Sequence, residues 1–209
     1  MRELTDYICE YPNVLRDGLC ESIIERFEAD GRKYRGTVIG DDDLKKSTDL
    51  HISMLPEWKD VDEKFYEVIS NKFSEYIEYL NKDLGYETYP NFFDEGYQIQ
   101  KTCVGQSYQW HHDATIDGRF AHLRDRLYEY GERVATFILY LNDDFDGGQT
   151  QFFNDESCAI IPERGKLIFF PANNMYIHRG DVVTDGAKYI MTGWMYGKFV
   201  CEAPWIWIN

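Results

Sequence analysis

Two histidines and an aspartate stand together in the segment Trp110–Ala114, which reads WHHDA. On a β-strand, successive side chains point to opposite faces, so His111 and Asp113 would share one face and His112 would point away. A metal held by this pair needs a third ligand from a distant strand, and His178, beside a turn, is the candidate. Two histidines and one carboxylate on one side of a metal leave open positions opposite, as in non-haem Fe(II) oxygenases.

A His-x-Asp pair alone is not specific, because structural histidines with ordinary partners give the same pattern. Lys188, ten residues after His178, adds a second constraint. It opens the strand-like segment KYIMTGWMYG, where alternation predicts a shared face for Lys188, Ile190, Thr192 and Trp194. A lysine on an apolar and aromatic strand face needs an anion to stabilise its charge. The alternative is that Lys188 only begins the strand in solvent.

The elements that must position these residues are mostly β-strands. From about Gly96 the hydrophobic period is two, and aromatic and β-branched residues are frequent. Turn sequences containing glycine separate the strand-like segments, which predicts a sandwich, barrel or jelly roll. The segment 114–132 interrupts them directly after Asp113. We expect it to be a lid over the site or a solvated amphipathic helix packed on the barrel.

The first ninety residues have a helical period instead. The spacing predicts one helix that Asp17 caps and that ends near Gly31, and a second over about residues 58–84, ended by Gly85. Between them, Gly40–Met54 is predicted to be a polar loop or a short strand region.

Composition narrows the class of protein. The chain has 209 residues, which suits one domain at roughly 150 residues per domain. Its formal net charge of −15 disfavours binding to nucleic-acid phosphates. No apolar run approaches the roughly 18–20 residues that span a bilayer, and the N-terminus lacks the basic start and apolar core of a signal peptide. Five scattered cysteines without a CxxC pair suit reduced thiols. We therefore expect a cytoplasmic protein with no nucleic-acid or membrane partner.

The order of the motifs resembles the Fe(II)/2-oxoglutarate-dependent dioxygenases of the prolyl 4-hydroxylase type. The segments that carry the resemblance are GQSYQWHHDA, RVATFILYLNDDFDGGQTQFF, IIPERGKLIFFP and IHRGDVVTDGAKYIMTGW. The similarity spans about residues 88–199, and small bacterial or phage-encoded members look most alike; a phage-encoded protein would act in the host cytoplasm. It implies an α+β fold, a double-stranded β-helix (jelly roll) with N-terminal supporting helices. It also implies a single catalytic domain over 1–209, with helical support over about 1–90 and a jelly-roll core over about 91–200.

The resemblance also implies roles for individual residues. His111, Asp113 and His178 match the ligands of Fe(II), and Lys188 and Tyr140 match the residues that bind the distal carboxylate of 2-oxoglutarate. The other implied site residues are Tyr108 beside the iron, Thr192 and Trp194 in the pocket, and Arg133 near the substrate. Arg133 has an alternative role, in which it simply pairs with an acidic neighbour.

The implied activity is hydroxylation of a prolyl residue in a peptide or protein. It would use Fe(II), 2-oxoglutarate and O2, yield succinate and CO2, and take ascorbate as reductant. Two alternatives stay open: the same chemistry on a free amino acid or another residue, and a jelly-roll binding module without turnover. One departure concerns Thr102, where family members often carry a tyrosine, so that Gln98 and Gln100 on the same strand become candidates for other polar contacts. Because of this departure, the identity of the substrate is less well predicted than the iron chemistry.

Overall fold

The computed structural model describes residues 3–16, 18–37, 44–84, 91–114 and 131–198. Asp17, Gly85, most of the expected lid and the C-terminal tail lie outside these residues. Two antiparallel sheets account for most of the fold. Within the described residues, no helix is long and apolar enough to cross a membrane.

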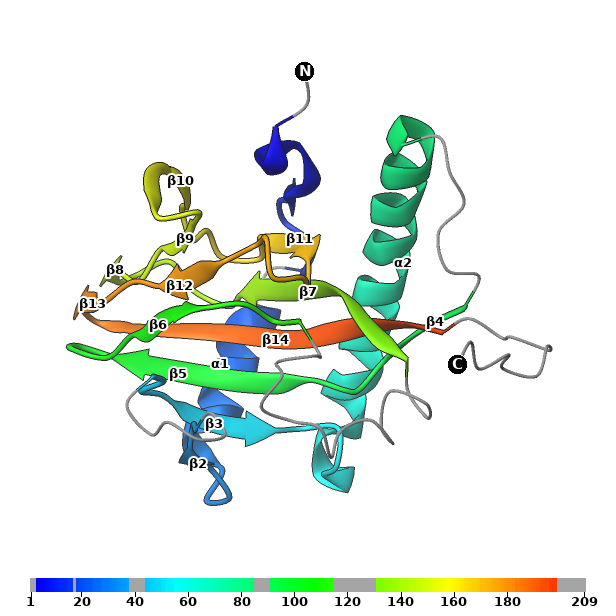
Figure 1. Ribbon diagram of the computed structural model, residues 1–209. Helices are drawn as coiled ribbons and strands as arrows, with labels where there is room; N and C mark the ends of the chain where they lie inside the picture. Colours follow the sequence, from blue (N-terminus) through cyan, green and yellow to red (C-terminus); the bar gives the residue numbers. More distant parts are fainter. Residues whose placement is uncertain (1–2, 17, 38–43, 85–90, 115–130, 199–209) are drawn as a thin grey trace, which may run out of the picture.

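The larger sheet has its long strands at its centre (Figure 1). Its strands, in spatial order, are β1 (Cys9–Tyr11), β11 (Leu167–Pro171), β7 (Glu132–Tyr140), β14 (Ala187–Lys198), β5 (Gln98–Cys103), β3 (Thr48–His51) and β2 (Tyr34–Arg35), and β4 (Asn91–Asp94) also pairs with β14. The strand-like segments predicted from the period of two are therefore confirmed as the centre of this sheet.

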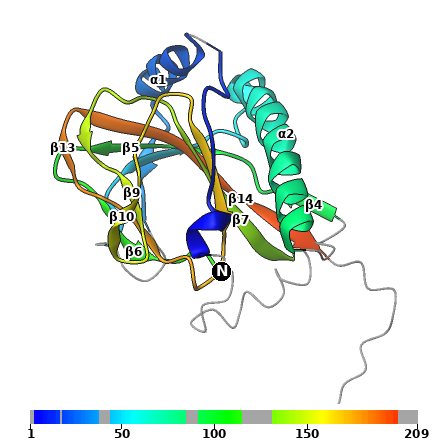
Figure 2. The same cartoon turned by 90° about the horizontal axis from the view of Figure 1, so that it is seen from above.

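A smaller sheet and a short ribbon complete the β structure. The smaller sheet runs in the order β10 (Asp155–Ile160), β9 (Thr150–Phe152), β12 (His178–Gly180) and β6 (Tyr108–His111), and the ribbon pairs β8 (Asp146–Gly147) with β13 (Val183–Asp185). Seen from above, the smaller sheet lies on one side of the larger sheet and the helices on the other (Figure 2). This arrangement agrees with the expected double-stranded β-helix.

Both predicted helices form: α1 (Leu19–Ala29) and α2 (Lys59–Leu84), with short 3-10 turns at η1 (Leu4–Tyr7) and η2 (Pro56–Trp58). The residue that precedes α1 is Gly18, in a left-handed conformation (φ 78°) and without a side-chain cap. Glycine adopts that conformation without the steric cost of a Cβ. The predicted cap, Asp17, lies outside the described residues, so its role stays a prediction.

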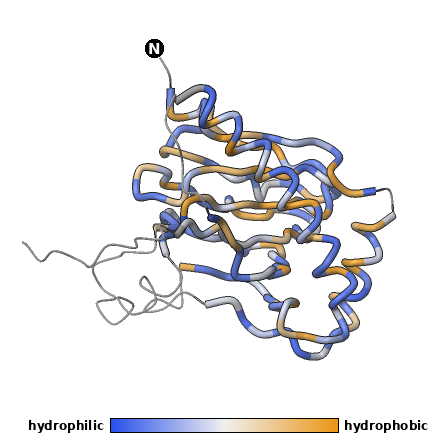
Figure 3. The backbone as a smooth tube through the Cα atoms, turned by 90° about the vertical axis from the view of Figure 1, so that its right-hand side faces the viewer, coloured by the Kyte–Doolittle hydropathy of each residue, from blue (hydrophilic) through white to orange (hydrophobic). Residues whose placement is uncertain are grey.

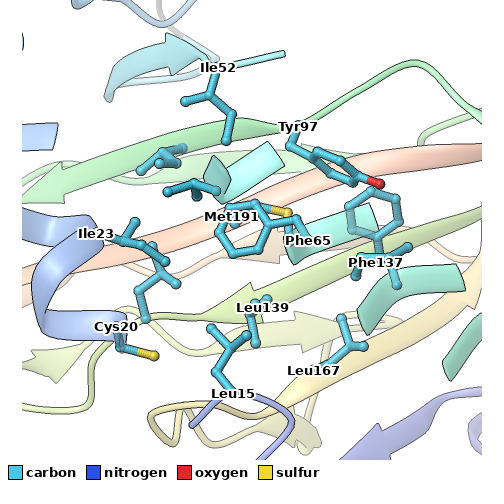
Figure 4. Close-up of a cluster of buried hydrophobic side chains, with 14 of the residues drawn as sticks. Leu15, Cys20, Ile23, Ile52, Phe65, Tyr97, Phe137, Leu139, Leu167 and Met191 are labelled. Carbon is cyan, nitrogen blue, oxygen red and sulfur yellow. The ribbon is translucent and has the colours of Figure 1, made fainter. Parts of the chain in front are cut away.

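The outer face of the larger sheet packs against both helices. Phe65, Ile69 and Phe73 of α2 and Ile23 and Phe27 of α1 are buried there. Figure 4 shows Ile23 and Phe65 among the sheet residues of this cluster, which include Leu139 and Met191. Hydrophobic and hydrophilic stretches are mixed along the backbone in Figure 3. The central strands β7 and β11 are largely buried on both faces, because one face packs on this cluster and the other faces the smaller sheet.

The first ninety residues are not only helical. They also supply β1, β2 and β3, which lie at the two ends of the larger sheet. The helical support region expected over about 1–90 is corrected to this extent. These strands have two to four residues, which is too short for an alternating pattern to stand out in the sequence.

We expect Phe65→Ala to destabilise the protein by about 3–5 kcal/mol, because the fully buried ring leaves a cavity between α2 and the sheet. Urea unfolding measures the change in free energy. Tyr66→Ala is the matched control: its side chain is 60% exposed, so the change should stay within about 0.5 kcal/mol. A loss below about 1 kcal/mol for Phe65→Ala would mean that α2 does not depend on this contact.

Candidate metal centre and cosubstrate pocket

The smaller sheet brings the two predicted histidine ligands together. His111 at the end of β6 and His178 at the start of β12 are directly opposite each other in antiparallel pairing. Asp113 follows β6 by two residues, and one ligand atom from each of the three residues lies within 4.8 Å of the others. The Nε2 atoms of His111 and His178 lie 3.7 and 3.6 Å from the carboxylate of Asp113. Among the described residues, this is the only group with the composition and spacing of a metal site.

Hydrogen bonds orient both imidazoles for a metal. Nδ1 of His111 lies 2.7 Å from the carbonyl oxygen of Gln109, and Nδ1 of His178 lies 3.0 Å from that of Tyr176. A ring nitrogen facing a carbonyl must carry the proton, which leaves the lone pair of Nε2 for an ion. The Tyr108 ring stacks on His111 at 3.6 Å, as expected for a residue beside the iron site.

Electrostatics keep His111 and Asp113 in the metal-binding state. Burial, together with the neighbouring His178, lowers the pKa of His111, so that its imidazole is neutral near pH 7. Burial alone would raise the pKa of Asp113, but the two histidines and a hydrogen bond from Thr136 outweigh it, and the net shift is downward. The result is a neutral His111 imidazole beside the Asp113 carboxylate, and together with His178 they form the two-histidine, one-carboxylate donor set that Fe(II) oxygenases use.

His112 is not part of this group. Its Nδ1 atom is buried and has no hydrogen-bond partner in the described parts of the chain. The alternation of side chains predicted that His112 would point away from Asp113, and the geometry agrees with that reading.

A residue that the sequence did not reveal supports Asp113 from the other sheet. Thr136 on β7 donates a hydrogen bond of 2.7 Å from Oγ1 to Oδ2 of Asp113. Thr136 is buried, and it fixes the carboxylate against the larger sheet.

Thr136→Val removes this hydrogen bond at nearly constant volume, and we expect Fe(II) affinity to fall about 10- to 100-fold, as is typical for partners that orient metal ligands. Titration with Fe(II) under anaerobic conditions measures the effect. Thr192→Val is the control, because the Thr192 hydroxyl donates to the carbonyl of Phe137 and not to a ligand. If the two variants bound Fe(II) with equal affinity, the hydrogen bond from Thr136 would have no role in metal binding.

Lys188 lies inside the fold and does not begin its strand in solvent. Only 5% of its surface is exposed, and burial lowers the pKa of its ammonium to about 8. Nζ donates to the carbonyl of Gly148 at 2.5 Å, and no carboxylate of the described residues forms an ion pair with it. Gly148 permits this contact, because a Cβ at its position would press on the Lys188 side chain at 3.2 Å.

Tyr140 lies beside this lysine. Nζ of Lys188 sits 5.5 Å from the centre of the Tyr140 ring, and the Tyr140 hydroxyl forms a 2.7 Å hydrogen bond with Thr150. Ile190 is the strand neighbour of Tyr140, so Lys188, two residues earlier, shares its face. The structure therefore places a buried, unneutralised cation and two hydroxyl groups together. A carboxylate would satisfy them, and 2-oxoglutarate carries one at its distal end.

Thr192 and Trp194 continue the same face of β14 toward the metal ligands. Trp194 lies opposite Thr136, whose hydroxyl binds Asp113. The guanidinium of Arg133 lies 3.7 Å from the centre of the Trp194 ring and pairs with Glu95 at 3.3 Å. The acidic neighbour foreseen as an alternative for Arg133 is thus present, and a role near the substrate stays a prediction.

Comparison with known proteins identifies the family. A sequence model described as the 2OG-Fe(II) oxygenase superfamily matches residues 97–196, the region that contains the metal ligands and Lys188. Residues 97–196 therefore form a 2OG-Fe(II) oxygenase domain. A curated relative of this oxygenase, prolyl 4-hydroxylase 1 of Arabidopsis thaliana, is 31% identical over 120 residues, which cover 48% of this chain and 40% of the relative. The oxygenase spans less than half the length of the first curated relatives it matches.

Solved structures give the same fold over nearly the whole oxygenase. The viral collagen prolyl hydroxylase of Paramecium bursaria Chlorella virus-1, in complex with 2-oxoglutarate, superimposes with a TM-score of 0.62 at 22% identity, covering 94% of this chain and 100% of that one. A prolyl hydroxylase of Trichoplax adhaerens, bound to a fragment of hypoxia inducible factor, reaches 0.65 at 14% identity, covering 93% and 87%. These matches confirm the jelly-roll fold that the motifs implied.

Proposed function

We propose that the protein is an Fe(II)- and 2-oxoglutarate-dependent dioxygenase that hydroxylates prolyl residues in a peptide or protein. The observation that carries the proposal is the pairing of two sites in one fold. His111, Asp113 and His178 form a three-ligand group, and Lys188 is a buried cation that pairs with no carboxylate of the described residues. A binding module without turnover needs neither of these features. Relatives named as prolyl hydroxylases support the choice of substrate.

Each residue has a definable task in this reaction. When bound, Fe(II) and 2-oxoglutarate would supply the activation of O2 that puts one oxygen atom into a substrate C–H bond and the other into succinate, with release of CO2. His111, Asp113 and His178 hold the ion on one side and leave the other side open. Lys188 binds the distal carboxylate with a charge-assisted hydrogen bond, and Tyr140 adds a neutral one. Ascorbate serves as the external reductant that keeps iron in the ferrous state.

The apolar surroundings exclude water from this centre. Phe152, Phe170 and Tyr176 pack between the two sheets. The Phe170 ring lies 4.8 Å from His178 and the Phe152 ring 5.7 Å from it. The low dielectric of this region strengthens the attraction between Lys188 and a bound carboxylate. We also propose a reducing location such as the cytoplasm, because Cys20, Cys103 and Cys158 form no disulfide within the part of the chain that the structure describes.

The test uses the purified protein with Fe(II), ascorbate and 2-oxoglutarate labelled at C1, with and without a library of proline-containing peptides. We expect peptide-stimulated release of labelled CO2 and the gain of one oxygen atom on proline, seen by mass spectrometry. Hydroxylation of free proline alone would shift the substrate to a free amino acid. If 2-oxoglutarate were consumed under none of these conditions, the remaining hypothesis would be a jelly-roll binding module without turnover.

A further inference from the structure

The inner face of the larger sheet, which faces the smaller sheet, has an apolar half and a polar half. On the β7 and β11 side it carries Ile138, Ile168 and Phe170. On the β5 and β3 side it carries four polar residues: Gln98 and Gln100 on β5, and Asp49 and His51 on β3. The strand pairing places them on one face, because Gln98 lies opposite both Thr192 and His51, and Gln100 lies opposite both Ile190 and Asp49. Polar groups in this position call for a polar partner.

A chain of hydrogen bonds links the two glutamines to the rim of the sheet. Nε2 of Gln100 donates to Oε1 of Gln98 at 2.6 Å, and Nε2 of Gln98 donates to the hydroxyl of Tyr34 at 2.7 Å. Tyr34, Gln98 and Gln100 thus form a row of hydrogen-bonded side chains. Gln100 is 8% exposed, whereas Tyr34 is 45% exposed, so this row runs from solvent into the fold. Within the described part of the chain, Oε1 of Gln100 accepts no hydrogen bond, and one of its N–H groups remains unused.

Two further polar atoms beside this row have no hydrogen-bond partner among the residues that the structure describes. They are Nδ1 of His51, opposite Gln98, and Nε1 of Trp194, two residues beyond Thr192 on the next strand. Both atoms are buried, and an unpaired buried donor or acceptor costs free energy. A ligand that lies along this part of the face would satisfy them together with Gln100.

The row lies directly beside the reaction site. β5 is the neighbour of β14, which carries Lys188, Thr192 and Trp194, at the spacing of about 4.8 Å usual for paired strands. Trp194 lies opposite Thr136, which holds the metal ligand Asp113. A group bound to Gln98 and Gln100 would therefore flank the 2-oxoglutarate pocket on the side away from the apolar half.

Apart from Lys188, which is assigned to the distal carboxylate of 2-oxoglutarate, the charged groups near the row already have partners of opposite charge, and this limits the kind of ligand that the row can bind. Oδ2 of Asp49 pairs with Lys45 at 2.6 Å and its Oδ1 accepts from Ser47 at 2.7 Å. Arg133, at the other end, pairs with Glu95. What remains is a row of neutral amide and hydroxyl groups, each able to donate or accept. The main-chain amide of a peptide has the same pair of functions, whereas a carboxylate or an ammonium group would find no counter-charge.

We propose that Gln98 and Gln100 bind a main-chain amide of the peptide substrate next to the residue that is hydroxylated, and that Tyr34 holds Gln98 in position at the rim. The inference rests on the function proposed above and makes these residues determinants of peptide binding. Neither glutamine acts on iron or on the distal carboxylate of 2-oxoglutarate.

The test compares wild type with Gln100→Leu, using the best proline-containing peptide from the library. Loss of one or two neutral hydrogen bonds should raise the KM for the peptide about 5- to 30-fold, while the KM for 2-oxoglutarate stays within about twofold. Tyr34→Phe keeps the ring but removes the acceptor for Gln98, so a smaller rise of about 2- to 5-fold is expected. Tyr66→Phe, an exposed tyrosine on α2, is the matched control and should change neither constant.

A second set of peptides locates the amide itself. Replacing one backbone amide at a time by an ester removes one N–H donor. At one position, the ester should weaken binding to wild type but add nothing to the defect of Gln100→Leu, since interacting groups are not additive. Additive effects at every position, an unchanged peptide KM in Gln100→Leu, or a rise confined to the KM for 2-oxoglutarate would each overturn the inference. Wild type that hydroxylates no peptide would instead refute the proposed function, and this inference with it.

Discussion

Asp113→Ala is expected to abolish 2-oxoglutarate turnover, while His112→Ala keeps a measurable part of it. Asp113 supplies the only carboxylate of the three-ligand group, and its removal leaves two neutral imidazoles that hold a divalent ion far less tightly. We expect Fe(II) affinity to fall at least about 100-fold, beyond the effect usual for a residue that only orients a ligand. His112 lies outside the group, so its loss affects packing alone.

The measurements are anaerobic Fe(II) binding and release of labelled CO2 from 2-oxoglutarate. Circular dichroism controls for folding, since Asp113 is buried and accepts a hydrogen bond from Thr136. His111→Ala should resemble Asp113→Ala. Loss of iron in His112→Ala together with full retention in His111→Ala would reverse the assignment of the two neighbouring histidines.

The second large effect is expected at Lys188. A hydrogen bond to a charged group contributes about 1.5–3 kcal/mol, so Lys188→Met should raise the KM for 2-oxoglutarate about 10- to 150-fold, at about 1.4 kcal/mol per decade. Lys188→Arg should recover only part of the loss, because the planar guanidinium group of arginine replaces the compact ammonium group of lysine. Fe(II) affinity should change little, since Lys188 is not among the metal-binding residues.

The chain offers a matched control in Lys166. Its ammonium is also largely buried, but it pairs with Glu10 at 2.9 Å and with Glu163 at 2.6 Å. Lys166→Met should therefore lower stability without changing the KM for 2-oxoglutarate. Arg164 is another cation that could in principle bind the distal carboxylate of 2-oxoglutarate, but it pairs with Glu21 and is half exposed. If Lys188→Met left the KM unchanged, Lys188 would not be the anchor of the cosubstrate.

The parts of the site that follow from local geometry could be predicted from the sequence. Alternation along one strand places His111 and Asp113 on one face and Lys188 with Thr192 on another, and this needs no knowledge of the partner strands. The long central strands and α2 were predictable for the same reason, because their periods persist over many residues.

Contacts between strands far apart in sequence were not predictable in this way. The hydrogen bond from Thr136 to Asp113 and the one between Tyr140 and Thr150 depend on how β6, β7 and β9 are placed against each other. A single sequence carries no signal for that placement, and a threonine in a strand is ordinary. The row from Tyr34 to Gln100 depends likewise on the pairing of β2, β3 and β5, two of which are too short to show a period.

The direct pairing of His111 with His178 has a mechanical consequence. An ion bound there ties together two adjacent strands whose ligands are far apart along the chain, at positions 111 and 178. Such a tie closes a long loop, and closing a long loop removes chain entropy from the unfolded state. The ion would thus act as a reversible cross-link of the smaller sheet, stabilising the fold by mass action as its free concentration rises above the dissociation constant. Iron supply would then set the lifetime of the folded protein as well as the fraction of it that is ready to react.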